Sequence, residues 1–376
     1  MNRRRFLFVA GAAIATVAVT ARLAAARKVG KPVGPPTLQP WTLADEAPAN
    51  PYETARALIG AAVLAPSEWN SQPWRFEADL AAVRLVADSA RELPVTDPER
   101  RGLMISLGAA LENLLIAARA YGLHPNVSYF PRENVVAEVM WTGGDVRRDH
   151  ALFTAIPERR TNRREYEERG ILPDERAQIT AQVPEGYTLH WLDDRDAVHS
   201  VADLVGDAVH DQVSDRAAQR EQFAWMRFGD DAERHGDGVP VDALEFGTIT
   251  GWFAKRFFNP TSWLYRFGAD RASHQARDAV RSTAALALLT ANGRGAQPWL
   301  MGGQAFERVA LQATHLKLAV HPLSAPIEVA SRRPDLLRHF GAAGEEPLAL
   351  LRLGHGRQLP ATPRRSVALV TSFRNS

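Results

Sequence analysis

Residues 65–76 have the sequence APSEWNSQPWRF, and this stretch decides the fold that the sequence predicts. It follows a segment, residues 52–64, whose apolar side chains fall at helical spacing, and Pro66 ends the predicted helix. One interpretation makes it a helix-terminating loop: Trp74 and Phe76 enter the core while its serine and asparagine cap backbone groups. The alternative is a loop that binds a ligand, and motifs elsewhere in the chain are needed to distinguish the two interpretations.

Two basic elements favour the binding interpretation. Arg159-x-Thr161-x-Arg163 opens the second part of the chain, and Pro363-Arg364-Arg365 follows a predicted strand that ends at Gly354. Either cluster by itself is more often a solvated surface patch. Guanidinium groups in such clusters also bind phosphate through paired, charge-assisted hydrogen bonds.

Taken together, these three stretches resemble the nitroreductase family, whose members are FMN-dependent oxidoreductases that work as intertwined homodimers. The resemblance implies an α+β fold of the nitroreductase type. It also implies that short polar side chains meet the ribityl chain and the uracil-like edge of FMN, while arginines meet the phosphate. Arg163 would lie near N1 and O2, and a turn at Met301-Gly302-Gly303 would present backbone N–H groups to N5 and O4. The implied cofactor-binding residues are Ser67, Asn70, Gln72, Arg159, Thr161, Arg163, Gly302, Gly303, Arg364 and Arg365.

An internal repeat is suggested by two predicted helices, 106–122 and 302–318. Shifted by 195 positions, they align without gaps, with identities that include Gly108 with Gly303 and Glu112 with Glu307. Alanine-rich amphipathic helices also resemble each other through composition alone. The first half carries the Ser/Asn loop and the second the arginine element, so the chain resembles the Acg-type proteins, in which two halves are fused into a pseudo-dimer with one site.

We therefore expect a signal at 1–26, a Pro-rich linker at 27–51, and two halves at 52–150 and 151–376. Each half should hold a small mixed sheet flanked by helices, with the two aligned helices packed centrally. Further strands are predicted at 83–87, 187–192 and 348–353, and helices at 173–182 and 283–290. An aromatic-rich insertion near 215–275 is either a lid over the flavin or a helical excursion packed on the core.

The first residues have the features of an export signal. Arg3 and Arg4 precede a spacer, Phe6 and Leu7, and the run to residue 21 carries no charge, which resembles a twin-arginine signal. At 16 residues this run is shorter than the roughly 20 that span a bilayer. An ordinary secretory signal or an uncleaved anchor is the alternative. We expect export to the periplasm by the twin-arginine machinery and no stable membrane span in the mature chain.

Composition excludes several classes of protein. The 376 residues contain no cysteine, which removes thiol catalysis, disulfides and iron–sulfur clusters. Beyond residue 26 the chain carries 41 basic and 43 acidic side chains, which is unlike a nucleic-acid-binding body. The 11 histidines show no metal-ligand spacing, and no dinucleotide, P-loop or nucleophile-elbow motif is complete, so no metal site is expected.

The expected function is FMN-dependent hydride transfer. A small-molecule donor reduces flavin N5, and a nitroaromatic, quinone or similar conjugated acceptor then takes the hydride, with no indispensable catalytic side chain. NAD(P)H is the family's usual donor, although little of it is found outside the cytoplasm. The alternatives are a flavin-sequestering protein with the lid closed, or a decayed site without flavin.

Overall fold

The computed structural model describes residues 41–144, 149–241 and 268–373, together with residues 255, 259, 261 and 262. The predicted signal at 1–26 and most of the predicted linker lie outside the described residues. In the described part of that linker, residues 41–51, neither helix nor strand is found up to residue 50, and Pro51 already begins helix α2. Its Trp41 lies against the body: the indole Nε1 donates to the Thr362 carbonyl at 3.0 Å, and the Arg160 guanidinium lies 4.2 Å from the ring centre.

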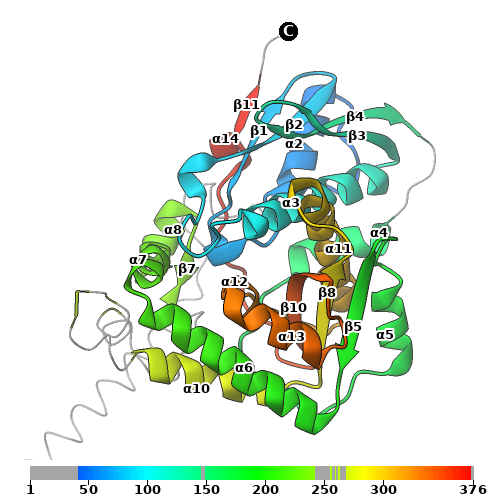
Figure 1. Ribbon diagram of the computed structural model, residues 1–376. Helices are drawn as coiled ribbons and strands as arrows, with labels where there is room; N and C mark the ends of the chain where they lie inside the picture. The colour runs from blue at the N-terminus through cyan, green and yellow to red at the C-terminus, as the bar shows by residue number, and fades with distance from the viewer. Residues whose placement is uncertain are drawn as a thin grey trace, which may run out of the picture. The chain divides into compact units, whose positions relative to one another are not determined.

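The first half of the chain forms a five-stranded sheet. Its strand order is β11-β1-β2-β4-β3, with antiparallel neighbours except for β11, which pairs parallel with β1 (Figure 1). Strand β11 comes from the C-terminal end of the chain. It lies in the predicted second half of the sequence but belongs to the first sheet. The elements are α2 (Pro51–Ala62), η2 (Glu68–Asn70), β1 (Trp74–Ala78), β2 (Ala82–Ala87), η3 (Ser89–Arg91), α3 (Arg101–Ala120), β3 (Leu123–Arg132), β4 (Val135–Gly143), α14 (Val367–Val370) and β11 (Thr371–Phe373).

The second half repeats the first in its sheet topology. Its four strands lie in the order β5-β8-β10-β9, which matches β1-β2-β4-β3, and all neighbours are antiparallel. The first sheet is therefore mixed, as predicted. In the second half the four strands are antiparallel, and the parallel contact is an isolated bridge between Thr161 and Val320 at the β9 edge. The elements are α4 (His150–Ala155), η4 (Ile156–Glu158), α5 (Pro173–Thr180), β5 (Tyr187–Leu192), β8 (Ala285–Ala291), α11 (Ala296–His315), β9 (Ala319–Leu323), α12 (Ala325–Glu328), η7 (Ala330–Arg332), α13 (Arg333–His339) and β10 (Glu346–Gly354).

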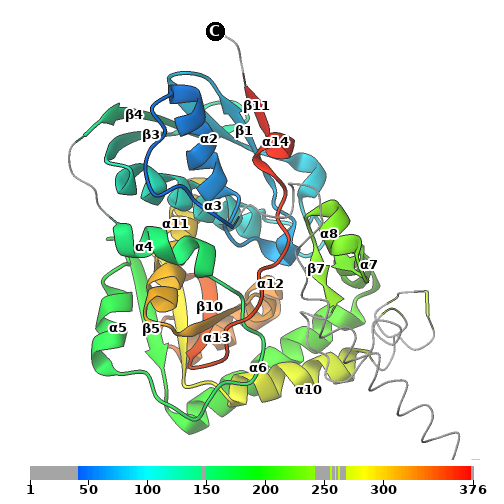
Figure 2. The ribbon, with the colours of Figure 1, turned by 180° about the vertical axis from the view of Figure 1, so that it is seen from behind.

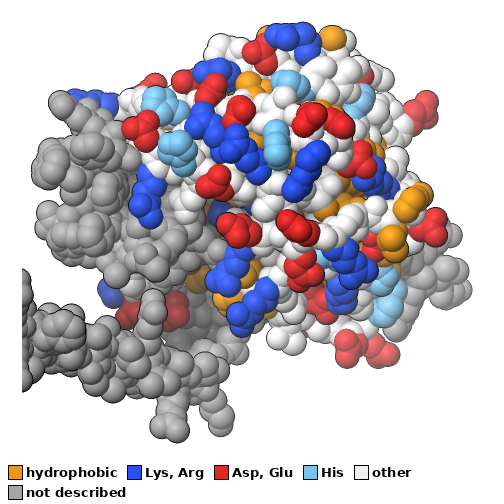
Figure 3. Space-filling model, turned by 90° about the horizontal axis from the view of Figure 1, so that it is seen from below, with side chains coloured by type: hydrophobic (Ala, Val, Ile, Leu, Met, Phe, Trp, Pro, Cys, Tyr) orange, Lys and Arg blue, Asp and Glu red, His pale blue; other side chains and the backbone are white. Residues whose placement is uncertain are grey.

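A long insertion separates β5 from β8, where the first half has only residues 79–81 between β1 and β2. Its helices α6 and α10 pack side by side along the bottom of Figure 1. Viewed from below, acidic and basic side chains are interspersed on this face (Figure 3), as expected where Arg277 pairs with Asp207 across the two helices. Most of the aromatic-rich part, 242–267, lies outside the described residues. The insertion contributes α6 (Arg195–Ser214), α7 (Arg216–Ala224), β6 (Met226–Arg227), α8 (Asp231–His235), β7 (Val239–Pro240) and α10 (Gly268–Arg281).

The helices α3 and α11 cross at the centre, as predicted (Figure 2). Two glycines permit this crossing. A Cβ atom at Gly108 would lie 1.9 Å from the Leu300 carbonyl oxygen, and one at Gly303 would lie 2.2 Å from the Ile105 carbonyl oxygen. Gly303 and Leu300 stand 195 positions after Gly108 and Ile105, so the two contacts are reciprocal. The bounds of the helices, Arg101–Ala120 and Ala296–His315, differ by the same 195 positions.

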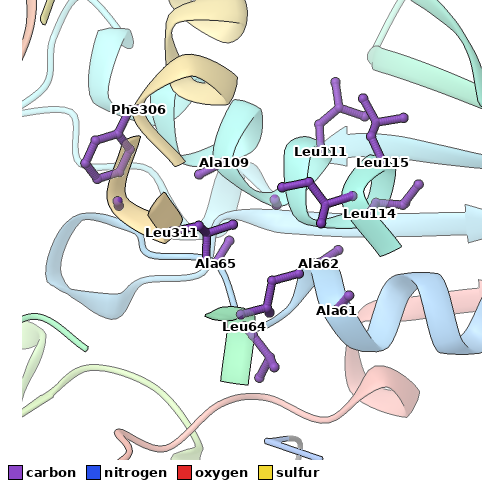
Figure 4. Close-up of a cluster of buried hydrophobic side chains, with 14 of the residues drawn as sticks. Ala61, Ala62, Leu64, Ala65, Ala109, Leu111, Leu114, Leu115, Phe306 and Leu311 are labelled. Atoms are coloured by element: carbon purple, nitrogen blue, oxygen red, sulfur yellow. The ribbon is translucent and has the colours of Figure 1, made fainter. Parts of the chain in front are cut away.

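One hydrophobic core extends through both halves and surrounds this crossing. Figure 4 shows part of it, with side chains of α2, α3 and α11 such as Ala61, Leu114 and Leu311. Among the described residues, α3 is the one helix long and apolar enough to be a candidate membrane span, and 89% of that apolar window is buried inside the protein. Burial in this core accounts for its apolar composition.

The prediction of a helix at 283–290 is wrong, because residues 285–291 form strand β8. Alanine and leucine favour helices, and the run shows no alternation of polar and apolar residues. The alternation is absent because both faces of β8 are covered. Ala287 and Leu289 face the shared core, while Leu286 and Leu288 face a second core beneath α6 and α13.

Candidate functional site

A cavity of about 370 Å³ lies between the two halves of the chain. Its walls come from the loop after α2, the start of α3, the segment after η4, the turn after β9, the strand β10, and the helices α6 and α10. The insertion also contributes Gln222, Met226 and Val239. Three of the predicted cofactor-binding residues line it: Ser67, Thr161 and Arg163. Residues nearly 100 positions apart in the sequence are thus brought to one site.

The loop 66–74 has an unusual backbone. Trp69, Asn70 and Gln72 have positive φ values of 50°, 51° and 52°, a region that non-glycine residues adopt only where surrounding structure holds them. Within the loop, the Ser67 hydroxyl accepts from the Gln72 backbone N–H at 2.9 Å. Ser67 and Glu68 of this loop line the cavity, whereas the Asn70 and Gln72 side chains are buried in the protein.

The side chains of Asn70 and Gln72 hold other segments in place. The Asn70 amide donates to the Gly238 carbonyl at 2.9 Å and its oxygen accepts from Arg364 at 2.8 Å. The Gln72 amide donates to the Gly236 carbonyl at 2.7 Å, and its oxygen accepts from the Arg365 backbone N–H at 2.9 Å. The Asn70 and Gln72 side chains, which were predicted to contact the cofactor, therefore form hydrogen bonds with protein groups instead. These bonds hold the insertion and the C-terminal segment against the loop.

Arg159 and Arg364 form a buried basic pair behind the loop. Their side chains donate to the Leu64 carbonyl at 3.5 Å each, and both residues are nearly inaccessible to solvent. Burial lowers the pKa of Arg364 well below its usual value, and the charges of Arg159 and Arg160 add to this effect. The Nε atoms of Arg159 and Arg364 have no hydrogen-bond partner among the described residues.

Glu307 of α11 faces this pair. Its carboxylate lies 3.7 Å from the Arg159 Nε, and the Asn113 side chain of α3 lies beside it. Burial raises the pKa of Glu307 to about 7, against the opposing charge of Arg159. The aligned residue on α3, Glu112, accepts from Arg119 at 2.7 Å and from Arg308 at 3.1 Å. The two aligned carboxyl groups thus sit in different electrostatic surroundings.

The predicted turn at Met301–Gly303 is absent, because these residues lie inside α11. Gly303 is required for the crossing with α3, and a Cβ atom at Gly302 would lie 2.4 Å from the Leu348 side chain. Neither glycine is among the residues that line the cavity. Close helix packing, and not backbone approach to a ligand, explains both glycines in this structure.

Strand β9 and the short helix α12 line the cavity where sequence reasoning did not place a site. Their residues at the cavity include His321 of β9 and Ile327 and Glu328 of α12, with Ser324 between the two elements. The His321 Nδ1 lies 3.1 Å from an Arg352 terminal nitrogen, and arginine only donates, so Nδ1 accepts and the proton resides on Nε2. Burial, with the charges of Arg352 and Arg163, lowers the pKa of His321 well below its usual value, which keeps the ring neutral. A Pro-Ile-Glu sequence directly after a buried strand was the available signal.

Carboxyl groups gather at one end of the cavity. Glu68 of the loop lies within side-chain hydrogen-bonding reach of Glu328, and a Cβ atom at Gly102 would lie 2.3 Å from a Glu68 carboxyl oxygen. Burial raises the pKa of Glu68 well above its usual value, and the charges of Glu328 and Asp97 raise it further. Arg101, 4% exposed, lies beside them, and one of its terminal nitrogens has no hydrogen-bond acceptor among the described residues.

A gathering of carboxyl groups can also be a metal site, which needs several ligands arranged around one point. Within the described ranges, no group of three or more His, Asp or Glu residues is arranged to hold a metal ion.

The sequence is similar to curated proteins over most of its length. It is 30% identical over 334 residues to "Putative NAD(P)H nitroreductase Rv3131" of Mycobacterium tuberculosis, an alignment that covers 85% of this chain and 92% of the relative. The chain belongs to the nitroreductase family. A second relative of this nitroreductase-family chain, "Putative NAD(P)H nitroreductase acg" of the same organism, is 28% identical over 336 residues, covering 84% of this chain and 94% of the relative. No family model matches the sequence.

Solved structures related to this nitroreductase-family chain are more distant. A nitroreductase with bound FMN from Bacteroides fragilis is 12% identical, covers 56% of this chain and 92% of its own, and has a TM-score of 0.34. The nitroreductase NfnB is 17% identical, covers 60% of this chain and 99% of its own, and has a TM-score of 0.39. Scores this low add nothing to the family assignment that the sequence relatives provide.

Proposed function

We propose that this chain is an FMN-dependent oxidoreductase that reduces a conjugated acceptor such as a quinone or a nitroaromatic compound. The observation that carries the proposal is the convergence of Ser67, Thr161 and Arg163 on one cavity from opposite halves of the chain. The relatives named as NAD(P)H nitroreductases support the same class of reaction. In this proposal, FMN supplies hydride transfer at N5 and the protein binds and orients the reactants.

The residues around the cavity fit FMN in their chemistry. The cations Arg163 and Arg101 can meet a phosphate, and the unsatisfied Nε atoms of Arg159 and Arg364 lie close behind the same loop. The hydroxyls of Ser67 and Thr161 suit polar atoms of the ribityl chain or the ring edge. Apolar side chains, including Phe306 and Leu348, suit the faces of the isoalloxazine ring.

We further propose that the chain is a fused pseudo-dimer with a single flavin site. Three observations support this proposal: the matching strand orders of the two sheets, the 195-residue offset between α3 and α11, and the reciprocal glycine contacts at their crossing. The first half contributes the Ser67 loop and the second contributes Thr161 and Arg163. Because each half carries only part of the motif set, one FMN per chain is expected.

The purified protein should bind about one FMN per chain, as measured by its visible spectrum and by the flavin released on denaturation. Replacing Arg163 by alanine should raise the FMN dissociation constant about 10- to 100-fold, since charge-assisted hydrogen bonds contribute about 1.5–3 kcal/mol. Arg75→Ala, which changes an arginine side chain 67% exposed on β1, is the matched control and should bind normally. Unchanged affinity in Arg163→Ala would contradict this cofactor site, and two FMN per chain would contradict the single-site model.

The insertion forms part of the cavity wall, and this observation favours flavin sequestration as a second candidate function. Gln222, Met226 and Val239 lie in the cavity wall together with residues of α6 and α10. Access of an acceptor therefore depends on these segments. Turnover with NADH, NADPH or chemical reductants against quinones and nitroaromatics would favour the enzyme, whereas bound flavin without turnover would favour the sequestering protein.

We also propose export through the twin-arginine pathway, because residues 3–7 have the sequence RRRFL ahead of an uncharged run. Replacing Arg3 and Arg4 together by lysine should leave most of the protein in the cytoplasmic fraction. Arg27→Lys, beyond the expected cleavage site, is the control and should be exported normally. Equal periplasmic amounts of both variants in cell fractionation would rule out this route.

A further inference from the structure

We propose that the carboxyl pair of Glu68 and Glu328 is the proton donor for reduction of the acceptor in this cavity. The inference rests on the proposed flavin-dependent function and adds a role for residues of this chain. Both side chains line the cavity. They come from elements far apart in the sequence, the loop after α2 and the short helix α12, so the tertiary structure creates the pair.

The Glu68 and Glu328 side chains lie within hydrogen-bonding reach of each other at the cavity wall. Two ionised carboxylates repel each other and cannot hydrogen-bond, so a hydrogen-bonded carboxyl pair must hold at least one proton. The charged groups that face Glu68 are Glu328 from α12, Asp97 from the segment before α3, and Arg101 from α3. Two of these three are acids, and they disfavour the ionised form of Glu68. Burial acts in the same direction and keeps the proton in place at neutral pH.

The pair is also held in a defined position. The Gln212 amide of α6 donates to the Glu328 carboxylate, and the Glu68 carboxyl rests against Gly102, where any larger residue would displace it. Asp97 accepts from the Leu103 backbone N–H at 2.8 Å, so it is engaged at the start of α3. Glu328 is only partly buried, which allows the pair to recover a proton from solvent after each turnover.

The proposed step balances in atoms and charge. Bound FMN in its reduced form would supply a hydride, which is two electrons and one proton, for a quinone. The role of the carboxyl pair is to donate one proton to the quinone oxygen that becomes negative. The products are the hydroquinone, oxidised flavin and a carboxylate pair with one additional negative charge. Solvent then returns a proton to the pair. Such a positioned acid contributes about 10²- to 10⁴-fold to the rate.

The first test compares acceptors in Glu68→Gln, with the flavin reduced chemically before mixing. At pH 7, oxidation by a quinone should slow at least about 100-fold, because the hydroquinone needs a proton. Oxidation by ferricyanide, which accepts electrons alone, should change less than about twofold. Glu328→Gln is the second variant, and Glu138→Gln, a carboxyl on β4 outside the cavity that pairs with Arg84, is the control.

A second readout needs no turnover. In infrared difference spectra at neutral pH, wild type minus Glu68→Gln should show the C=O band of a protonated carboxyl group, because the band of Glu307 is common to both proteins and cancels. Wild type minus Glu138→Gln should show no such band. Flavin-loaded protein in which both cavity variants reduce the quinone at the wild-type rate would overturn this inference alone. Wild-type protein that binds no flavin would overturn the proposed function and the role of the pair with it.

Discussion

Gly303→Ala is expected to lower the free energy of unfolding by about 4 kcal/mol, above the usual cost of overpacking. The new methyl carbon would lie 2.2 Å from the Ile105 carbonyl oxygen and 2.8 Å from two further backbone atoms of that residue. A flexible side chain could move away, but the backbone of α3 cannot move without separating the two central helices. Gly108→Ala should behave in the same way, because its methyl carbon would lie 1.9 Å from the Leu300 carbonyl oxygen.

Helix α2 provides a matched control for the removal of a glycine. A Cβ atom at Gly60 would meet no atom of another segment within 4 Å, and the φ of this residue is not positive. Gly60→Ala should therefore raise stability by about 0.5–1 kcal/mol, the ordinary helical preference for alanine. Urea unfolding followed by circular dichroism measures all three variants. If Gly303→Ala and Gly60→Ala were equally stable, the close crossing of α3 and α11 would be wrong.

This crossing also places two residues of the cavity wall. α3 contributes Ile105 and α11 contributes Phe306, each close in sequence to the contact region. Separation of the helices would move both side chains. We therefore expect Gly303→Ala to weaken flavin binding as well as stability, although neither glycine lines the cavity.

Glu307→Gln is expected to stabilise the protein by about 3 kcal/mol at pH 8 and to have almost no effect near pH 4. The folded-state pKa of Glu307 is raised from 4.5 to about 7. At low pH both the folded and the unfolded states hold the proton. Between pH 4.5 and about 7 the unfolded state loses its proton first, so the free energy of unfolding of the wild type falls across this window. Glutamine mimics the protonated form and avoids this loss.

Glu112→Gln is the control, because Glu112 occupies the aligned position on α3 with two arginine partners. Removing one member of such a buried ion-pair network leaves the arginines uncompensated and should destabilise the protein at pH 8 by about 3 kcal/mol. The two substitutions are thus expected to have opposite signs at pH 8. Urea unfolding at pH 4, 6 and 8 measures the difference, and destabilisation by Glu307→Gln at pH 8 would show that Glu307 is ionised and well paired with Arg159.

Several elements could be predicted from sequence because their signals are local. The helix before Pro66, the strands near 83–87, 187–192 and 348–353, and the two aligned helices all follow periodicity or proline. The start of α3 was misplaced by five residues, at 106 instead of Arg101. No capping residue directly precedes this helix: the Leu103 backbone N–H is satisfied by the Asp97 side chain, six positions earlier.

Three residues of the motif stretches line the cavity, but the motifs did not assign the direction of each side chain. Ser67, Thr161 and Arg163 line the cavity, whereas Asn70, Gln72, Arg364 and Arg365 bond to one another or to the protein backbone. The direction of each side chain depends on the positive φ values of the loop. Those values depend on bonds to residues 236–238 and 363–365, which no local pattern encodes.

The sequence alone carried the motifs that resemble the family, the alignment between two helices and the residue types available for binding, because these are properties of spacing and motif. Only the tertiary structure identifies β8 as a strand. Both of its faces are covered by other segments, so its sequence lacks the alternation of polar and apolar residues that indicates a strand. The tertiary structure also decided that Glu68 meets Glu328, and that Glu307 and Glu112, aligned in sequence, differ in environment. Burial and proximity set these properties, and both arise only when distant segments pack together.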